Sequence, residues 1–529
     1  MPTASTDPTF LLIKTLTKAE KRNFRLYVTR NQSKDDLKFI LLFDAFDKQT
    51  TYDEDAIFKK VPEIKKEQLS NLKAHLYRQL LTSLRLLHKQ KNADIDIREH
   101  IDYAKILYNK GLYVPALRIL EKAKGMARLH NQSFLILEIV EFEKLIESRH
   151  ITRAHEGRAT ELAQESQQMR QQLLQSSQLT DLALQMYGFY LQFGHARNAE
   201  DLATIEAFFK SNYPPLYSQP VKEMMNGNEI DFFGKVYLAQ SLAWKNYVSQ
   251  DWLQYCRWSY QWVLFFEREP IMKLNDTSLY IKGIHNLLLG YFLTLRHDRM
   301  LHLLQSLENY LQKHADTLDE NTQTLAFHHL YSSKINVHFL QGTFAEGVKL
   351  IPEIERQLKS FQFRLDQHRV LVLYYKIASL YFGNGNYGKT IDYLNKIINA
   401  KLGNLRADIQ CFARLLQLIV HFEKGHYNLL EYLIKSAYRF IAKNEDLSGV
   451  MTEVLKFLRR AMTLGRRDLR QAFIELRERL IELSVHPFER RSFIYLDIIS
   501  WLDSKIDNKP IAQIIHEKFL EREKARIRP

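Results

Sequence analysis

The sequence predicts an all-α protein, a solenoid of antiparallel helix pairs, and a recurring turn motif is the first reason. In this motif a glycine is followed two positions later by an aromatic residue. It occurs as Gly111-x-Tyr113-x-x-Ala116, Gly342-x-Phe344-x-x-Gly347, Gly385-x-Tyr387-x-x-Thr390 and Gly425-x-Tyr427-x-x-Leu430. Each copy continues with an aliphatic residue four positions on, at Leu120, Ile351, Leu394 and Ile434. Two helices joined by a tight glycine turn, repeated along the chain, produce this spacing.

Composition is the second reason. The chain has 529 residues, 46% of them hydrophobic, but only 12 prolines and 18 glycines. That length exceeds what one compact core supports, and no low-complexity linker divides the chain. Leucine, lysine, glutamine, glutamate and alanine abound, and these residues favour helix. We therefore expect an array of helical repeats with little or no sheet.

Residues 1–92 lack the turn motif and predict a separate N-terminal helical cap domain. Thr17 and Glu20 form a capping box that opens a helix running through Thr29. A second helix is expected over residues 34–48. A third, over about 66–91, carries a leucine stripe at steps of three and four: Leu69, Leu72, Leu76, Leu80, Leu84 and Leu87. We expect this cap to shield the open end of the repeat array.

The helix pairs are expected to form two sub-arrays, residues 93–211 and residues 232–529. Residues 212–231 between them predict a loop or hinge, because Tyr213-Pro214-Pro215-Leu216, Pro220 and Asn226-Gly227-Asn228 interrupt the helical pattern. Turns within the second sub-array are expected near Gln250, His297, Gly342, Gly385, Gly425, Gly465 and Lys505.

The stretch from Leu373 to Asn399, LYYKIASLYFGNGNYGKTIDYLNKIIN, resembles a tetratricopeptide repeat. The match places Tyr374, Ile377, Ala378 and Tyr381 at first-helix packing positions, Gly385 and Tyr387 at the turn, and Thr390, Leu394 and Ile397 on the second helix. A second good match runs through Ala104, Gly111, Tyr113, Ala116, Leu120 and Ala123. The turns near Gln250, His297 and Gly465 depart from the family pattern, and its closing proline is mostly missing.

This resemblance implies a right-handed superhelix with a concave binding face and no catalysis. The cap and the irregular repeats together are also similar to uncharacterised bacterial solenoid proteins. That similarity implies no activity.

One segment matches two phosphate-binding motifs. Gly383-Asn384-Gly385-Asn386-Tyr387-Gly388-Lys389-Thr390 fits both G-x-x-x-x-G-K-T and G-x-G-x-x-G. Such a loop needs a strand before it, whereas the preceding residues predict the first helix of a repeat. The repeat register already explains Gly385 and Tyr387, so nucleotide binding is the third-ranked hypothesis.

No other motif indicates chemistry. The sequence has no H-E-x-x-H, no G-x-S-x-G and only two cysteines, Cys256 and Cys411, far apart. Its 19 histidines are scattered, and we expect them to be surface or capping residues, with His328 and His329 on different helix faces. The sequence therefore predicts no catalytic residue, no cofactor and no metal site, and we expect no enzymatic activity.

The cysteine usage and the N-terminus favour a cytoplasmic protein. The first residues have no early positive charge and only a short apolar run, unlike a secretory signal. The longest uncharged apolar stretch, Leu287 to Leu295, is about half of what a membrane-spanning helix needs. We expect no membrane insertion.

The net charge of +14 is concentrated at the two ends of the chain. Near the C-terminus a cluster contains Lys456, Arg459, Arg460, Arg466, Arg467 and Arg470, with Asp468 as its only acid. Arginine suits phosphate or carboxylate. A solvated helical surface is an equally good account of this cluster.

The leading functional hypothesis is a non-catalytic scaffold that holds a peptide or a partner helix on its concave, first-helix face. The candidate binding residues are Arg98, Asp102, Lys105, Tyr108, His329, Ser332, Asn336, Arg459, Arg460, Arg466 and Arg467. The rival hypothesis is an RNA- or DNA-binding solenoid whose basic ends contact phosphates.

Overall fold

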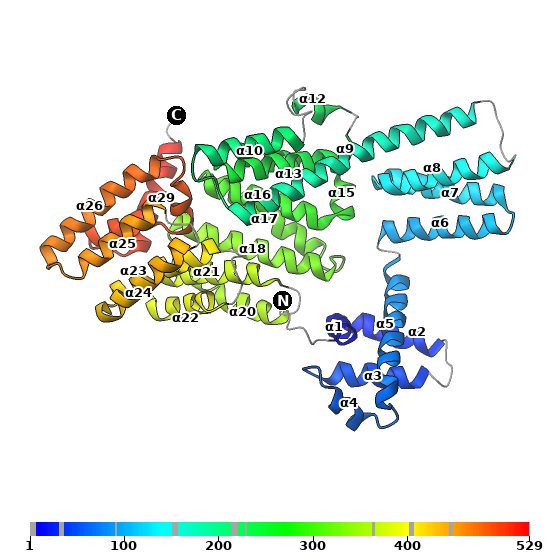
Figure 1. Ribbon diagram of the computed structural model, residues 1–529, viewed down its shortest axis with the longest axis horizontal. Coiled ribbons are helices and arrows are strands. Elements are labelled where there is room, and N and C mark those ends of the chain that lie inside the picture. Colours follow the sequence, from blue (N-terminus) through cyan, green and yellow to red (C-terminus); the bar gives the residue numbers. More distant parts are fainter. Residues whose placement is uncertain are drawn as a thin grey trace. The chain divides into compact units, whose positions relative to one another are not determined.

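The computed structural model describes residues 7–30, 36–89, 92–150, 157–212, 221–227, 230–361, 365–400, 407–443 and 448–527. Every regular element in these ranges is a helix, and none of these residues forms a strand (Figure 1). The predicted all-α class is therefore confirmed for the described chain. By their internal contacts the residues divide into two compact units, 1–171 and 172–529, and the division falls within the long helix α9 (Arg158–Phe193).

The first part of unit 1 is built around phenylalanine side chains. Its helices are α1 (Pro8–Thr15), α2 (Lys18–Arg30), α3 (Asp36–Lys48), α4 (Glu54–Lys60) and α5 (Lys66–His88). Phe24 and Phe43 pack with ring centroids 5.0 Å apart, and Leu76 of the predicted stripe is fully buried beside them. The predicted capping box is present, since Glu20 N–H donates to Thr17 Oγ1 at 3.2 Å and Thr17 N–H to Glu20 Oε2 at 2.8 Å.

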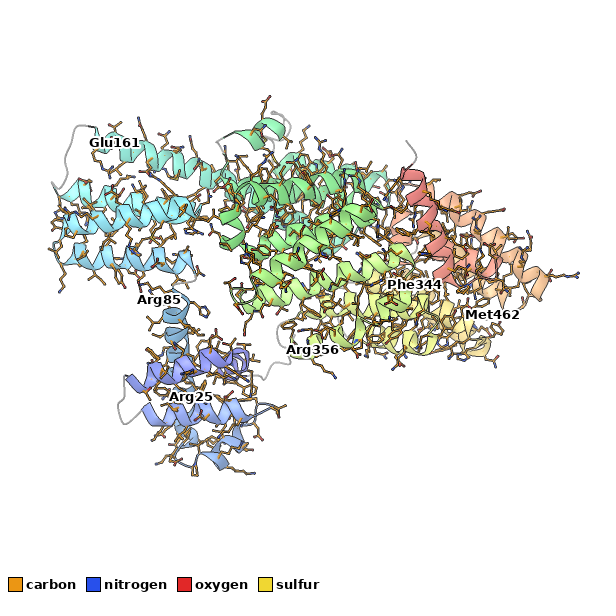
Figure 2. The ribbon with its side chains drawn as sticks, turned by 180° about the vertical axis from the view of Figure 1, so that it is seen from behind. Arg25, Arg85, Glu161, Phe344, Arg356 and Met462 are labelled. Carbon is orange, nitrogen blue, oxygen red and sulfur yellow. The ribbon has the colours of Figure 1, made fainter. Side chains whose placement is uncertain are left out.

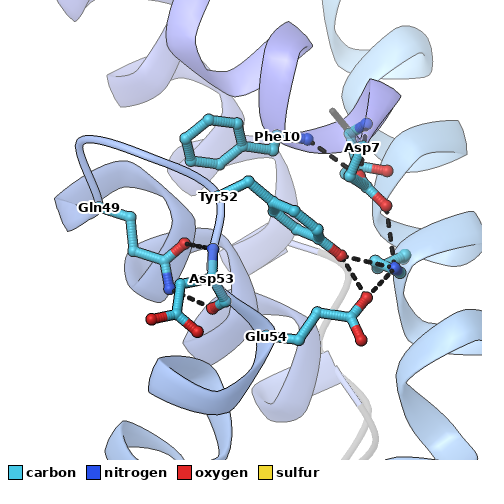
Figure 3. A network of polar contacts seen from close by, with 8 residues as sticks. Asp7, Phe10, Gln49, Tyr52, Asp53 and Glu54 are labelled. Carbon is cyan, nitrogen blue, oxygen red and sulfur yellow. Dashed lines mark hydrogen bonds and ion pairs between the residues drawn. The ribbon is translucent and has the colours of Figure 1, made fainter. Parts of the chain in front are cut away.

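A polar network fastens α1 and α4 to α5. Figure 3 shows Asp7, Tyr52 and Glu54 pointing toward one shared ammonium group. That ammonium, of Lys73, lies 2.9 Å from Asp7 Oδ2, 3.0 Å from Glu54 Oε1 and 2.9 Å from the Tyr52 hydroxyl. Burial and the hydrogen bond to Glu54 raise the pKa of Tyr52 to about 12, so the phenol stays protonated.

The second part of unit 1 begins the helix pairs. Here α6 (Ala93–Asn109), α7 (Tyr113–Leu129) and α8 (Ser133–Arg149) pack in sequence around Ala104, Ala116 and Leu120, none of which is exposed. A buried ion network joins α7, α8 and the start of α9. The Lys124 ammonium contacts the Glu143 carboxylate and lies 3.1 Å from Glu165, and Arg158 lies 3.6 Å from Glu143.

Unit 2 continues with the rest of α9 and with successive helices joined by short connections. These are α10 (Ala199–Asn212), α12 (Val221–Asn226), α13 (Phe232–Val248), α14 (Trp252–Arg268), α15 (Pro270–Asn275), α16 (Thr277–Leu293), α17 (His297–Lys313), α18 (Glu320–Gln341), α19 (Phe344–Val348), α20 (Ile351–Ser360), α21 (Gln367–Gly383), α22 (Tyr387–Ile398), α23 (Ala407–Glu423), α24 (Tyr427–Lys443), α25 (Gly449–Ala461), α26 (Arg466–Val485), α27 (Arg490–Tyr495), α28 (Ile498–Ile506) and α29 (Ile511–Ile527). Short connections make neighbouring helices antiparallel.

The predicted glycine turns have one common geometry. Gly385 has φ +73°, and the N–H of Asn386 donates to the carbonyl of Tyr381 at 2.9 Å. This is the left-handed helix ending that glycine adopts without a steric penalty. The glycines of the other three motif copies also have a positive φ. They are Gly111, Gly342 and Gly425.

The irregular turns use the same geometry without glycine. Gln250 (φ +61°) follows α13 and Leu295 (φ +57°) follows α16. The N–H groups of Asp251 and Arg296 then donate to carbonyls five residues back, at 2.9 and 2.8 Å. The turns expected near Gln250 and His297 are therefore present, although their motif residue is absent.

The last helices of unit 2 return onto earlier ones. The Trp501 indole N–H of α28 donates to Glu423 Oε1 of α23 at 2.7 Å, and Tyr495 stacks on Phe412 at 4.4 Å. Near α29, a Cβ on Gly342 would lie 2.6 Å from the Ala512 carbonyl, so only glycine fits there. This return was not predicted.

The predicted loop or hinge at residues 212–231 is only partly described. Residues 213–220 and 228–229 lie outside the described residues, and residues 221–226 form the short helix α12. The predicted domain limits at residues 92, 211 and 231 stay predictions.

Candidate functional site

A row of polar and aromatic side chains crosses five helices of unit 2. We call it the first-helix strip, and its members are Tyr187 of α9, Trp244 of α13, Lys282 and His285 of α16, His329 and Asn336 of α18, and Lys376 of α21. Helices α16, α18 and α21 contact one another in this order. Figure 1 shows these helices, with α18 between α16 and α21.

Direct contacts join the members of the strip from helix to helix. The Tyr187 ring lies 5.1 Å from Trp244, and the Lys282 ammonium lies 5.8 Å from the Tyr187 centroid. His285 stacks on His329 with ring centroids 3.9 Å apart. At the far end the Lys376 ammonium donates to Asn336 Oδ1.

Helical periodicity explains why these residues meet. On α18, His329, Ser332 and Asn336 follow one another at steps of three and four, which puts them on one face. Lys282 and His285 are three apart on α16. Hydrophobic residues on the other faces of these helices, such as Ile335 and Ile377, are fully buried and fix the orientation.

From α16 to α21, members of the strip lie with His328 and Arg369 in a concentration of basic groups. We call it the basic cluster, and it consists of Lys282, His285, His328, His329, Arg369 and Lys376. The rings of His328 and His329 are 5.3 Å apart, with their Nδ1 atoms 3.5 Å apart. Both residues are only 6% exposed.

Burial opposes positive charge on the histidines and lysines of the basic cluster. Burial, reinforced by the charges of Lys376, Arg369 and Lys282, lowers the pKa of His285 to about 3. Burial and His285 also hold the pKa values of His328 and His329 well below the ordinary value for histidine. The imidazoles are thus neutral at physiological pH.

Burial also lowers the pKa values of the two lysines of the cluster. Burial lowers the pKa of Lys376 from its ordinary 10.5 to about 8. Burial and the charge of Arg369 lower that of Lys282, which Asp276 partly offsets.

Several hydrogen-bonding atoms of this region have no partner within the described protein. They are buried, and they comprise Gln240 Oε1, Trp244 Nε1, His285 Nδ1, His328 Nε2, His329 Nε2 and Ser332 Oγ. A buried polar atom without a partner costs about 1–3 kcal/mol. Such a group of atoms on α13, α16 and α18 indicates that water or a ligand satisfies them.

Neutral imidazoles can bind a metal ion, but the basic cluster is a poor cation site. Lys282, Arg369 and Lys376 place positive charge around the three rings. The group of possible metal ligands that does converge among the described residues is His297, Asp298 and Glu523. There, however, Gln341 bonds to His297 Nε2 at 2.8 Å, and Glu523 pairs with Arg526 at 2.9 Å.

Of the candidate residues from the sequence, the structure brings His329, Ser332 and Asn336 together in this region. The expectation of surface or capping positions was wrong for His328 and His329, because both are buried and their rings meet. Sequence reasoning missed His285 and Lys376. Their only signal was a position on the first helix of a neighbouring pair.

The candidates in unit 1 lie on α6 and are mostly engaged at the surface. Arg98 pairs with Asp94 at 3.2 Å, and Asp102 lies 3.6 Å from Arg85. Lys105 is exposed.

Tyr108, the fourth candidate of unit 1, lies in an aromatic group. Its ring is 5.7 Å from those of both Tyr113 and Phe142. It is therefore partly engaged in packing between α6, α7 and α8.

The basic C-terminal candidates lie on α25 and α26. Arg459 is exposed, 5.9 Å from the Tyr438 ring, and Arg460 pairs with Glu475 at 2.8 Å. Arg467 is exposed, and the side chain of Arg466 lies outside the described residues. The carboxylate of Glu475 offsets part of the charge of this patch.

The segment from Gly383 to Thr390 connects two helices. Gly383 ends α21, and a Cβ there would lie 2.3 Å from the ring of Phe344, which is labelled in Figure 2. Asn386 caps α22 by accepting from the N–H of Lys389 at 3.1 Å. Helix packing and capping therefore explain most of the motif, and a helix occupies the place of the strand that a phosphate-binding loop requires.

No helix within the described ranges combines the length and the apolar character needed to cross a membrane. Comparisons with protein-family models, with curated proteins and with solved structures found no match to this chain.

Proposed function

We propose that this protein is a non-catalytic scaffold that binds a segment of a partner protein along the first-helix strip. The observation that carries the proposal is the concentration of buried, unpartnered polar atoms on α13, α16 and α18. A partner segment that separates these side chains on binding would reach the buried atoms and supply the missing hydrogen bonds. Tyr187, 39% exposed at the end of the strip, offers the aromatic contact that protein interfaces favour.

The proposal includes the solenoid architecture, right-handed and similar to tetratricopeptide repeats, with the first helices lining its concave face. Two features support it. The first helices α16, α18 and α21 contact in chain order, and the same left-handed turn recurs between helices of several pairs. Repeats that contact mainly their neighbours produce both features.

We also place the protein in the cytoplasm. Both cysteines, Cys256 and Cys411, are buried thiols in helices, which suits a reducing compartment. Burial raises the pKa of Cys256, so this thiol stays protonated and unreactive.

The test is affinity capture from native lysate with nuclease treatment, using two matched variants. Tyr187→Asp places a charge in the strip, whereas Tyr432→Asp places one on α24, where the native ring is 65% exposed. We expect a protein partner that survives nuclease, is lost with Tyr187→Asp and is retained with Tyr432→Asp.

Two outcomes would contradict the scaffold function. Material that nuclease removes from the wild-type protein would instead support the nucleic-acid hypothesis and its basic ends. A partner retained equally by both variants would place the binding surface away from the strip.

A further inference from the structure

We propose that the basic cluster is a binding site for the phosphoryl group of a phosphate monoester. The proposal goes beyond the scaffold function, because an isolated phosphate can occupy this site whether or not a protein partner binds the strip.

Charge is the first argument. The cluster brings Lys282, Arg369 and Lys376 close to three imidazoles, and the charges of all three affect His285. Two acids interact with its basic side chains: Asp276 acts on Lys282 and Asp366 pairs with Arg369, and both occupy helix starts.

Each of these two acids already has a structural role. Asp366 pairs with Arg369 at 2.8 Å and caps α21 by accepting from the Arg369 N–H at 2.9 Å. Asp276 caps α16 by accepting from the Leu279 N–H at 2.9 Å and from the Ser278 hydroxyl at 2.9 Å. The imidazoles and lysines therefore retain capacity for an added anion.

Hydrogen-bonding capacity is the second argument. His285 Nδ1, His329 Nε2 and Ser332 Oγ are buried and unpartnered, whereas His328 also interacts with the backbone of Arg369. The hydroxyl is a donor, and each imidazole nitrogen becomes one in the protonated ring or the appropriate tautomer. His285 and His329 belong to stacked rings 3.9 Å apart, and Ser332 lies on the same helix as His329, so a group with several acceptor atoms would satisfy more than one of them.

A phosphate monoester meets both requirements. It carries about −1.5 to −2 charges near neutral pH and three strongly accepting oxygens. A single carboxylate has one charge and two oxygens, so it would leave more of the donors and lysine charge unmatched. A metal cation would meet the repulsion of Lys282, Arg369 and Lys376.

Binding would also change the protonation of the cluster. An anion beside the rings favours the charged imidazole, which opposes the effect of burial on His285, His328 and His329. The charged side chains that act on these rings are Lys282 of α16 and Arg369 and Lys376 of α21. Next to them, Tyr187 lies beside Lys282, Asp276 at the start of α16 acts on Lys282, and Asp366 before α21 pairs with Arg369.

The experiment titrates the purified full-length protein by calorimetry with inorganic phosphate and with free phosphoserine, up to about 10 mM. We expect saturable binding by the wild-type protein. It should weaken at least tenfold in Lys376→Met and in His329→Gln. Lys389→Met is the matched control, because Lys389 is an exposed lysine on α22 outside the cluster, and it should change affinity less than twofold.

A peptide with one phosphoserine, and its unphosphorylated counterpart, distinguish the sources of the phosphate. Tighter binding of the phosphopeptide than of phosphoserine would place the phosphate on a polypeptide. Equal binding would assign the site to a small phosphorylated molecule. Both results support a phosphoryl site.

Three results would overturn the proposal: no saturable binding of phosphate or phosphoserine, equal weakening by Lys389→Met, or wild-type affinity in both cluster variants. If Lys376→Met does not fold, Lys282→Met replaces it. No partner protein is present in these titrations and Tyr187 lies outside the cluster, so failure here is distinguishable from failure of the scaffold function.

Discussion

The ammonium group of Lys376 is held in a setting that opposes its charge. It donates to Asn336 Oδ1 and lies 5.7 Å from the Phe339 ring, and no ion pair with a carboxylate forms among the described residues. Burial alone accounts for the fall of its pKa from 10.5 to about 8. The buried, unpaired ammonium therefore destabilises the folded protein, and an anionic ligand beside it would reduce that free-energy cost.

This environment predicts a stability that rises with pH. Between the folded pKa of about 8 and the unfolded value of 10.5, the unfolded chain holds a proton on Lys376 that the folded chain has released. Unfolding free energy therefore increases with pH in that window. Urea unfolding from about pH 7 to about pH 10 should show the wild-type protein gaining stability relative to Lys376→Met. A pH-independent difference between the two proteins would contradict the shifted pKa.

Gly385 provides a test of the turn geometry at a single residue. Its φ is +73°, and nothing lies within 4 Å of an added Cβ, so the cost of substitution is conformational. Gly385→Val should lower the unfolding free energy by about 1–3 kcal/mol. Gly388→Ala is the control. Its added Cβ would be 3.9 Å from the nearest side-chain atom, Asn386 Oδ1, so chemical denaturation should find it neutral or slightly stabilising. If both substitutions changed the unfolding free energy equally, the left-handed conformation of Gly385 would be refuted.

At the scale of the helices, the buried ion network of unit 1 holds α7, α8 and α9 together. The side chains of Lys124 and Glu143 are 9% and 3% exposed, so their charges are largely removed from water. Burial raises the pKa of Glu143 even though Lys124 opposes that effect. Such a pair is costly to break, because one partner is left buried and unpaired.

Lys124→Met should therefore destabilise the protein by about 3–5 kcal/mol. The double change Lys124→Met with Glu143→Leu removes both charges, and we expect it to recover much of that loss. Lys144→Met is the control, because Lys144 pairs with Glu141 at 2.8 Å with side chains 34% and 46% exposed, and it should cost about 0–1 kcal/mol. Thermal and urea unfolding measure all three. A double variant as unstable as Lys124→Met would show that packing rather than charge dominates.

Individual helices and turns were largely predictable, because their signals are local. The capping box at Thr17 and Glu20 and the glycine turns lie within a few residues of the elements they define. The turns at Gln250 and Leu295 carry no local glycine signal. Gln250 is anchored by its side-chain amide, which donates to the Ala196 carbonyl 54 positions earlier at 2.8 Å. A contact at that separation cannot be inferred from the neighbouring sequence.

At the scale of the whole chain, the candidate site was only partly predictable. The register of one repeat selected His329, Ser332 and Asn336, which share a face of α18. Their partners His285 and Lys376 lie 44 and 40 positions from His329 and Asn336 respectively, on other helices. Periodicity within a helix identifies a face, whereas the packing of helices decides which faces meet.

The return of the C-terminal helices escaped prediction for the same reason. Tyr495 and Trp501 contact residues of α23 some 80 positions earlier in the chain. The Glu423 carboxylate, 8% exposed, accepts from the Trp501 indole at 2.7 Å and contacts the Lys505 ammonium. Glu423 thus links two residues of α28 to α23.

Replacing Glu423 should loosen this end of unit 2. Glu423→Leu leaves the Lys505 ammonium and the Trp501 N–H without their acceptor, at a cost of about 3–5 kcal/mol. Glu423→Gln keeps an acceptor oxygen and should cost less. Hydrogen exchange should show protection lost first over residues 490–527, while α13 to α16 remain protected, since local openings follow contiguous packed units. Glu431→Gln, at an exposed position on α24, should stay within about 0.5 kcal/mol of the wild type. Unchanged exchange over residues 490–527 in Glu423→Leu would mean that apolar contacts such as Tyr495 on Phe412, rather than the buried carboxylate, hold the C-terminal helices in place.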